Sequence, residues 1–171
     1  MKKYSANGFT LMEVMITVVI IGILASIAYP SYTNYVTQTR RSDATIALTQ
    51  LASQQEKFFT QCGGYADTIG PNPPGRVCPP LPQGSPGGII DANTVSLLPG
   101  GNTRDGFYNI VITAAGGAFA NGFILTASPL LSQLASDVGK CATIVLNSTG
   151  VKSATGSDSL LGPNGGKCWK K

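Results

Sequence analysis

The chain has 171 residues, of which 43% are hydrophobic and 12% are charged, and its formal net charge is +4. This hydrophobic content excludes a disordered protein, and the low charge content indicates a surface that packs against copies of itself or another protein. The small positive charge does not by itself argue for nucleic-acid binding. The chain has no histidine and no phosphate-loop motif, so we expect neither an enzyme nor a cofactor.

A polar leader and a long apolar run open the chain. The leader is residues 1–8, MKKYSANG, and the run is residues 9–29, FTLMEVMITVVIIGILASIAY, with Glu13 as its one charge. A helix of this length rises about 30 Å, enough to cross the hydrocarbon core of a bilayer. A secretory signal is cleaved after its apolar region, whereas the small-residue junction here, Gly8, precedes it. Cleavage at Gly8 would leave a transmembrane segment on the mature protein.

We expect one helix from about Phe9 to Thr60, kinked at Pro30, because helical spacing of apolar residues resumes beyond the proline. The apolar stripe of its second half consists of Ala44, Ala47, Leu48, Leu51, Phe58 and Phe59. The first half has no partner in its own chain, whereas the stripe predicts burial against a sheet. Residues 30–171 would therefore form a single globular domain of common size.

A proline- and glycine-rich stretch, residues 62–106, follows this helix. It holds 8 of the 11 prolines and 10 of the 21 glycines. Such a density of helix and strand breakers predicts a loop without regular structure. Within it, residues 89–98 have enough apolar residues for a short strand or a turn of helix.

The four cysteines have no zinc-finger spacing, and the leader and apolar run direct the rest of the chain out of the cytoplasm. We therefore expect two disulfides. Four cysteines allow three pairings, and nearness in the sequence suggests Cys62–Cys78 and Cys141–Cys168. In the chain-entropy model, closing a loop of the first size stabilises the fold by about 3 kcal/mol.

Strand signals follow the loop. Residues 107–114, 122–128 and 141–147 are rich in β-branched and aromatic residues, and 151–154 predicts a fourth short strand. Successive strands with modest connections indicate an antiparallel meander over residues 107–154. Together with the long helix, they place the chain in the α+β class.

The segment GFTLMEVMITVVIIGILASIAYPSY resembles the N-terminus of type IV pilins with short leaders, the type IVa group. The match is position by position and consists of Gly8, Phe9, Thr10, Leu11, Glu13 and Pro30. The order of long helix, variable loop, antiparallel sheet and C-terminal cysteine pair is also similar to that family. The resemblance implies the pilin fold.

The resemblance also implies a processing and assembly route. A prepilin peptidase would cut between Gly8 and Phe9 and N-methylate Phe9. The subunit would wait in the bacterial inner membrane, and the pilus assembly machinery would then polymerise it into an extracellular helical filament. In that filament Glu13 would pair with the freed amino group of a neighbouring copy. Such pili support adhesion, twitching motility or DNA uptake.

Several alternatives stay open. The chain could be a pseudopilin of a type II secretion system, or a minor pilin that acts as an adhesin or DNA receptor. Gly22 and Pro30 either mark a weak helical stretch that loosens on assembly or are simply tolerated in a membrane helix. At the C-terminus, a lysine and aromatic group could bind DNA through phosphates and stacking, or form a solvated end with a packed tryptophan. That group consists of Lys167, Trp169, Lys170 and Lys171.

Overall fold

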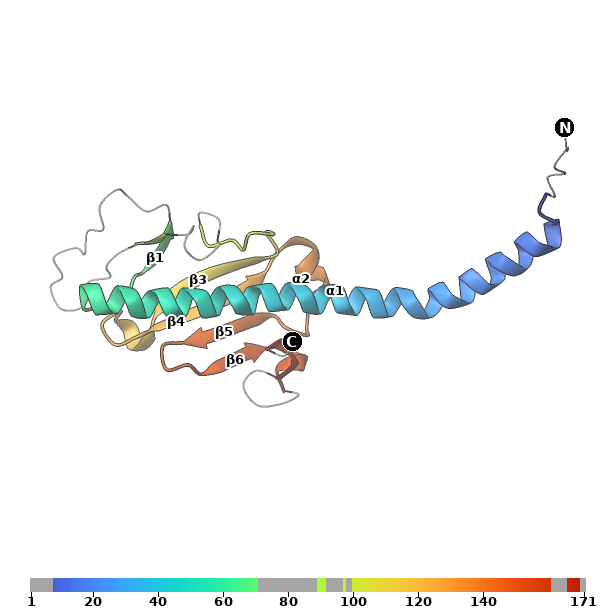
Figure 1. Cartoon of the computed structure of the whole chain (residues 1–171). Coiled ribbons are helices and arrows are strands. Elements are labelled where there is room, and N and C mark those ends of the chain that lie inside the picture. Colours follow the sequence, from blue (N-terminus) through green and yellow to red (C-terminus); the bar gives the residue numbers. More distant parts are fainter. Residues whose placement is uncertain (1–7, 71–88, 92–96, 98–99, 161–165, 170–171) are drawn as a thin grey trace, which may run out of the picture. The chain divides into compact units, whose positions relative to one another are not determined.

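The computed structural model describes residues 8–70, 89–91, 97, 100–160 and 166–169. The chain forms two compact units, Met1–Val36 and Thr37–Lys171. One helix, α1 (Leu11–Cys62), belongs to both units and continues through Pro30 (Figure 1). The predicted single helix, expected from about Phe9 to Thr60, is therefore confirmed within two residues at each end.

The second unit contains a four-stranded antiparallel sheet in the order β3-β4-β5-β6. Its strands are β3 (Tyr108–Ala114), β4 (Phe123–Pro129), β5 (Thr143–Asn147) and β6 (Lys152–Thr155). Because sequence neighbours are also spatial neighbours, the sheet is the predicted meander. Burial alternates along β4 without a break, so one face of the sheet is directed at the core.

The described residues also form three short 3₁₀ helices and one short α-helix. They are η2 (Ala115–Gly117), α2 (Leu131–Asp137), η3 (Ser157–Leu160) and η4 (Gly166–Cys168). Helix α2 joins β4 to β5 and was not predicted from the sequence.

Residues 62–106 were expected to form a loop without regular structure, and this expectation was wrong at residues 68–70, which form a strand. Strand β1 (Thr68–Gly70) pairs in parallel with β2 (Ile89–Asp91), which lies where a short strand or turn was expected. Ile69, at the centre of β1, is buried in the core, and this burial explains why three residues in a breaker-rich stretch become a strand.

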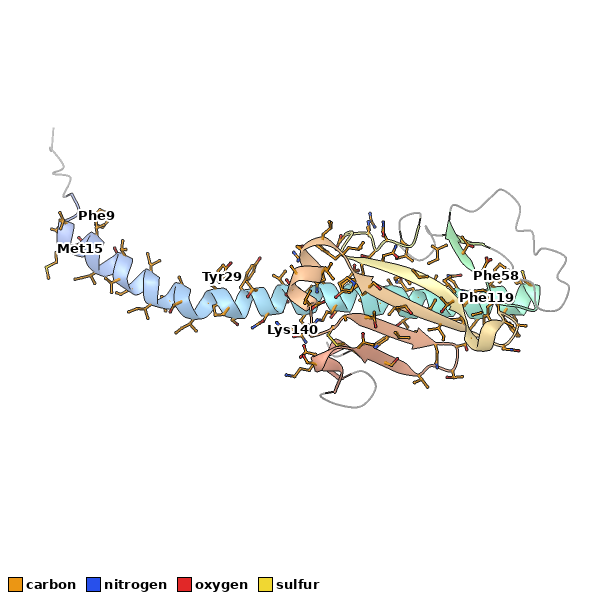
Figure 2. The ribbon with its side chains drawn as sticks, turned by 180° about the vertical axis from the view of Figure 1, so that it is seen from behind. Phe9, Met15, Tyr29, Phe58, Phe119 and Lys140 are labelled. Atoms are coloured by element: carbon orange, nitrogen blue, oxygen red, sulfur yellow. A yellow bond between two sulfur atoms is a disulfide. The ribbon has the colours of Figure 1, made fainter. Side chains whose placement is uncertain are left out.

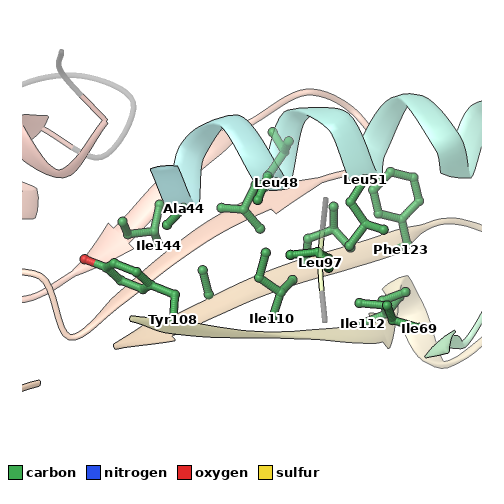
Figure 3. Close-up of a cluster of buried hydrophobic side chains, with 14 of the residues drawn as sticks. Ala44, Leu48, Leu51, Ile69, Leu97, Tyr108, Ile110, Ile112, Phe123 and Ile144 are labelled. Atoms are coloured by element: carbon green, nitrogen blue, oxygen red, sulfur yellow. The ribbon is translucent and has the colours of Figure 1, made fainter. Parts of the chain in front are cut away.

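The core of the second unit lies between α1 and the sheet. Leu48 and Leu51 of α1 lie with Ile110, Phe123 and neighbouring side chains in one buried cluster (Figure 3). Truncating one such leucine to alanine typically costs about 2–5 kcal/mol, so this cluster is a main source of stability. The predicted stripe is confirmed except at its last member, Phe59. That residue stays 38% exposed and stacks on Tyr65 instead.

Candidate functional site

The N-terminal end of α1 is fixed by a side-chain cap. The Glu13 backbone N–H donates to Thr10 Oγ1 at 3.3 Å, so Thr10 satisfies one of the amide groups that a helix start leaves unpaired. Glu13 lies in the first turn, where a carboxylate interacts favourably with the helix dipole. Threonine followed three residues later by glutamate is the capping-box pattern, a signal that the sequence analysis overlooked. Glu13 therefore has a local role besides the predicted pairing with a second copy.

Large apolar side chains cover the surface of the first unit. Phe9 is 83% exposed, and the most apolar 18-residue window of α1 has mean hydropathy 2.5 with none of its residues buried. Side chains such as Met15 stand out from the helix on all sides (Figure 2). A helix this long and apolar is long enough to cross a membrane.

Two hydroxyl side chains of this apolar stretch donate hydrogen bonds to carbonyl groups of the helix itself. Thr17 Oγ1 donates to the Val14 carbonyl at 2.8 Å, and Ser26 Oγ donates to the Ile23 carbonyl at 2.7 Å. Such bonds to the preceding turn hide hydroxyl groups from an apolar surrounding. The surface presented outward is therefore more apolar than the composition alone suggests.

Gly22 and Pro30 lie within this helical stretch without interrupting it. A Cβ built on Gly22 would meet no atom within 4 Å, so no contact inside the chain requires glycine there. Beyond Pro30, the Thr33 side chain donates to the Pro30 carbonyl at 3.0 Å. Their predicted role in loosening the helix during assembly stays a prediction.

A disulfide joins Cys141 to Cys168 in the second unit, and this confirms one of the two predicted pairs. Their Cα atoms are 5.8 Å apart. Cys62 is also disulfide-bonded, but its predicted partner Cys78 lies outside the described residues, so that pairing stays a prediction. The bond at Cys168 ties the chain beyond β6 back to the residue that precedes β5.

Three exposed lysines gather at this disulfide. Lys140 precedes Cys141, and Lys167 precedes Cys168, so the disulfide holds the two lysines in one region. Lys152, at the start of β6, lies with its Nζ 5.2 Å from the centre of the Trp169 ring. We call Lys140, Lys152, Lys167 and Trp169 the C-terminal basic cluster. Lys170 and Lys171, also predicted as contacts, lie outside the described residues.

Trp169 of this cluster is half-buried, and its indole N–H donates to the Ser153 carbonyl at 2.8 Å. Its ring is thereby fixed against β6, which agrees with a packed tryptophan. The sequence analysis missed Lys140 and Lys152, because they lie 27 and 15 residues before Lys167 in the sequence. Their nearness depends on the disulfide and on the pairing of β5 with β6.

A buried ion pair connects α1 with α2. Arg41 Nη2 lies 2.7 Å from Asp137 Oδ1, and Arg41 Nη1 lies 3.2 Å from Asp158 Oδ2. Although burial by itself would lower the pKa of Arg41, its bonds to the two carboxylates raise it. Arg41 therefore offsets one of the two negative charges that Asp137 and Asp158 place at this end of α2.

Tyr108 and Gln133 complete the bonds to Asp137. The Tyr108 hydroxyl donates to Asp137 Oδ2 at 2.7 Å, and Gln133 Nε2 donates to the same oxygen at 2.6 Å. Burial and the adjacent carboxylate raise the pKa of Tyr108, so its hydroxyl keeps its proton and remains a donor. The network is structural, because Arg41, Tyr108, Gln133 and Asp137 are buried and their bonds hold α2 on α1.

A cavity of about 240 Å³ lies between α1 and the segment before β3. Its polar lining includes Asp43, Gln50, Thr103, Arg104 and Asp105. Burial and the nearby charge of Asp105 raise the pKa of Asp43. Asp43 Oδ2 is buried and has no hydrogen-bond partner among the residues that the structure describes. The described residues contain no group of three side chains suited to hold a metal.

Comparison with known protein families shows the family to which the chain belongs. Residues 30–145, about two thirds of the chain, match the family described as type IV minor pilin ComP, DNA uptake sequence receptor. The chain belongs to this family of type IV pilins. Residues 3–29 of this pilin match the prokaryotic N-terminal methylation motif. The resemblance noted from the sequence, and the pilin fold that it implied, are thereby confirmed.

Similarity of this pilin to individual relatives is concentrated in part of the chain. It is 43% identical over 61 residues to the type IV major pilin protein PilA of Myxococcus xanthus, covering 36% of this chain and 28% of that protein. It is 60% identical over 40 residues to a type IV major fimbrial protein FimA of Dichelobacter nodosus, covering 23% and 26%. The matches thus span less than a third of these relatives.

A solved type IV pilin from Shewanella oneidensis is also similar to this pilin, with 22% sequence identity and a TM-score of 0.39. The match covers 68% of this chain and 89% of the other. The pilin family is structural and non-enzymatic.

Proposed function

We propose that this pilin is a structural subunit of a type IV pilus. The observation that carries the proposal is the helix of the first unit, whose apolar side chains are exposed from Phe9 to Tyr29. Such a surface requires an apolar surrounding, which a bilayer supplies before assembly and identical helices supply in a filament. The inner membrane would hold the precursor, and the extracellular filament would hold the mature chain.

Processing would take place between Gly8 and Phe9, followed by N-methylation of Phe9. The match to the N-terminal methylation motif supports this step, as does the position of Gly8 directly before the capped helix. Cleavage would expose a positive amino group four residues before Glu13. A prepilin peptidase and the pilus assembly machinery are the implied partners.

Mass spectrometry of the chain from sheared surface filaments tests both steps. We expect a mature N-terminus at Phe9 that carries one additional methyl group. Glu13→Ala should be processed normally but enter filaments poorly, because the freed amino group of a neighbouring copy then lacks its counter-charge. A matched control is Glu56→Ala, which removes an exposed carboxylate of the second unit. A different N-terminus, or normal filament yield from Glu13→Ala, would contradict the respective step.

A second candidate function is DNA binding by the C-terminal basic cluster. The family description, DNA uptake sequence receptor, and the gathering of three exposed lysines support it. Lysines that neutralise phosphates release counter-ions, so the affinity should fall steeply with salt. Because the Trp169 N–H is bonded to β6, we expect phosphate contacts rather than insertion of the ring between bases.

The test is the salt dependence of DNA binding by filaments or detergent-solubilised chain. Alanine at Lys140, Lys152 or Lys167 should each reduce the slope of log affinity against log salt concentration by about 0.7–0.9. Lys57→Ala provides the matched control, because Lys57 is an exposed lysine of α1 outside the cluster. Equal effects of Lys57→Ala and the three cluster variants would reject the cluster as the DNA site.

A further inference from the structure

Helix α2 has its polar and apolar faces reversed relative to an ordinary surface helix. Gln133 and Asp137 point inward and are completely buried. Leu131, Leu134 and Val138 are 79%, 49% and 67% exposed. A surface helix of a globular protein normally buries its apolar face and exposes its polar face. We call Leu131, Leu134 and Val138, the residue that follows the helix, the outer stripe of α2, because all three apolar side chains are exposed.

The bonds of the inward face explain why α2 cannot turn its stripe toward the core. Asp137 is held by Arg41 and Tyr108, and Gln133 is bonded to Asp137. Rotation of α2 would leave a buried arginine and a buried tyrosine hydroxyl without these partners, at a large cost. The outer stripe is therefore fixed on the surface by the polar network beneath it.

The backbone at the start of the stripe is also unusual. Leu131 has a φ of +49° and is the one non-glycine residue with positive φ among the residues that the structure describes. A leucine is disfavoured in this conformation, which asparagine or glycine would tolerate better. Strain of this kind is typically retained at sites where the residue has a function.

We propose that the outer stripe of α2 binds the apolar stretch of α1, Val14–Tyr35, of a second copy of the chain. The inference rests on the proposed function, because it requires copies to meet in a filament. Both surfaces lack exposed charges: Val14–Tyr35 contains no charged residue, and the one charged residue of α2, Asp137, is buried. Both also need an apolar cover once the subunit has left the membrane.

The position of α2 favours this occupant. Arg40 Nη1 donates to Ser132 Oγ at 3.3 Å, and Gln133 Nε2 donates to the Thr37 carbonyl at 3.4 Å. Helix α2 therefore lies beside the α1 residues that directly follow the apolar stretch in the sequence. Residues 36 and 37 are consecutive in one helix, so the outer stripe belongs to a helix beside the part of the second unit that is nearest in sequence to the apolar stretch.

Photo-crosslinking in assembled filaments tests the contact. The full chain carries p-benzoyl-phenylalanine in place of Leu134, or, as a control, in place of Val111, which is also 49% exposed. We expect irradiation of sheared filaments to link position 134 to residues 14–35 of a second copy, whereas position 111 does not reach that stretch. Crosslinks from position 134 to lipid, to another protein or to a different region of the second copy would overturn the proposal.

Substitution provides an independent measurement. Leu134→Asn should lower the ratio of filament-bound to membrane-held chain by about tenfold, whereas Val151→Asn, at an exposed valine in the β5–β6 turn, should leave it unchanged. An intact Cys141–Cys168 disulfide and unchanged N-terminal processing verify folding of each variant. An unchanged ratio for folded Leu134→Asn would overturn the contact alone. Absence of the wild-type chain from filaments would overturn the proposed function as well.

Discussion

The two units of the chain each contain part of α1, with similar apolar side chains. These side chains are exposed in the first unit and buried in the second. In the first unit, Ile16 and Leu24 are 51% and 62% exposed. In the second unit, Leu48 and Leu51 are completely buried beneath the sheet. The helical period is the same in both, so the pattern of apolar residues predicts the helix but not its partner. The apolar side chains of the first unit therefore stay exposed, whereas those of the second unit form its core.

Helix α2 extends this contrast within the second unit. The α1 stripe buries leucines and alanines, whereas α2 buries a glutamine and an aspartate and exposes its leucines. Arg41 makes the reversal possible, because it supplies the buried counter-charge. The exposed apolar surfaces of the described residues therefore have two origins. In the first unit the apolar side chains of α1 are exposed, and in the second unit α2 buries its polar residues and exposes its leucines.

The largest expected effect on stability is that of Arg41→Ala. Removal of the guanidinium leaves the buried Asp137 carboxylate without a counter-charge, and breaking such a pair typically costs about 3–5 kcal/mol. Urea unfolding of the detergent-solubilised chain measures the change. Arg40→Ala is the control, because Arg40 is partly exposed and lies over the Phe107 ring at 3.9 Å, a contact worth about 1 kcal/mol. Equal losses from the two variants would show that the network does not hold α2.

The contrast between the two units predicts that a leucine-to-alanine substitution lowers stability in the second unit and filament yield in the first. Leu51→Ala removes a buried core side chain and should lower the unfolding free energy by about 2–5 kcal/mol. Leu24→Ala removes an exposed side chain and should change that free energy by less than about 0.5 kcal/mol, while lowering filament yield. Urea midpoints and the fraction of chain in sheared filaments measure the two effects. A similar loss of stability from Leu24→Ala would show that the apolar stretch is covered within the chain.

Local patterns in the sequence predicted the long helix, its buried stripe, the meander and the Cys141–Cys168 bond. The helix, stripe and meander depend on residues a few positions apart, or on composition over a short window, whereas the disulfide was predicted from the order of the cysteines along the chain. The T-x-x-E cap at Thr10 was equally local and was available to the same reasoning. The methylation motif predicted the family for the same reason, because its characteristic residues lie within one segment.

Features that depend on distant residues could not be predicted in this way. Arg41 looks like a surface residue of α1, because its partner Asp137 lies 96 residues further along the chain. Helix α2 was missed because its outward leucines and inward polar residues contradict the usual amphipathic pattern. The basic cluster likewise gains Lys140 and Lys152 only after the disulfide and the β5–β6 pairing have formed.

A smaller effect is expected from Gln55, a polar residue buried within the apolar stripe. Its side chain donates to the Ala66 carbonyl at 2.8 Å and accepts from the Ala66 N–H at 2.9 Å. Gln55→Ala leaves both backbone groups buried without these partners, so we expect a loss of about 1–3 kcal/mol in unfolding free energy. Gln50→Ala, at an exposed glutamine of α1, should be nearly neutral. A neutral Gln55→Ala would show that water replaces the side chain at Ala66.

The smallest effect concerns Asp43. Unlike the other substitutions, removal of its charge is expected to raise the unfolding free energy. Its pKa in the folded chain is raised above the ordinary value of 3.8, first by burial and then by the charge of Asp105. Folding therefore favours the protonated carboxyl, and the ionised form opposes folding. At pH 7 Asp43→Asn should raise the unfolding free energy, by about 0.5 kcal/mol because the side chain is partly solvated. That gain should shrink as pH falls through the raised pKa and vanish below about 3.8.

Stability curves of wild type and Asp43→Asn between pH 3 and pH 7 measure this difference. Asp105→Asn is a second variant that leaves Asp43 in place and should move the pKa of Asp43 toward its ordinary value, because it removes the nearby like charge. A gain for Asp43→Asn that is independent of pH would mean that the amide makes a new hydrogen bond. The Asp43 carboxylate, whose Oδ2 has no partner among the described residues, would then not be the source of the effect. A gain that shrinks with falling pH would instead distinguish the half-buried Asp43 from Asp137, whose carboxylate oxygens accept hydrogen bonds from Arg41 and Tyr108.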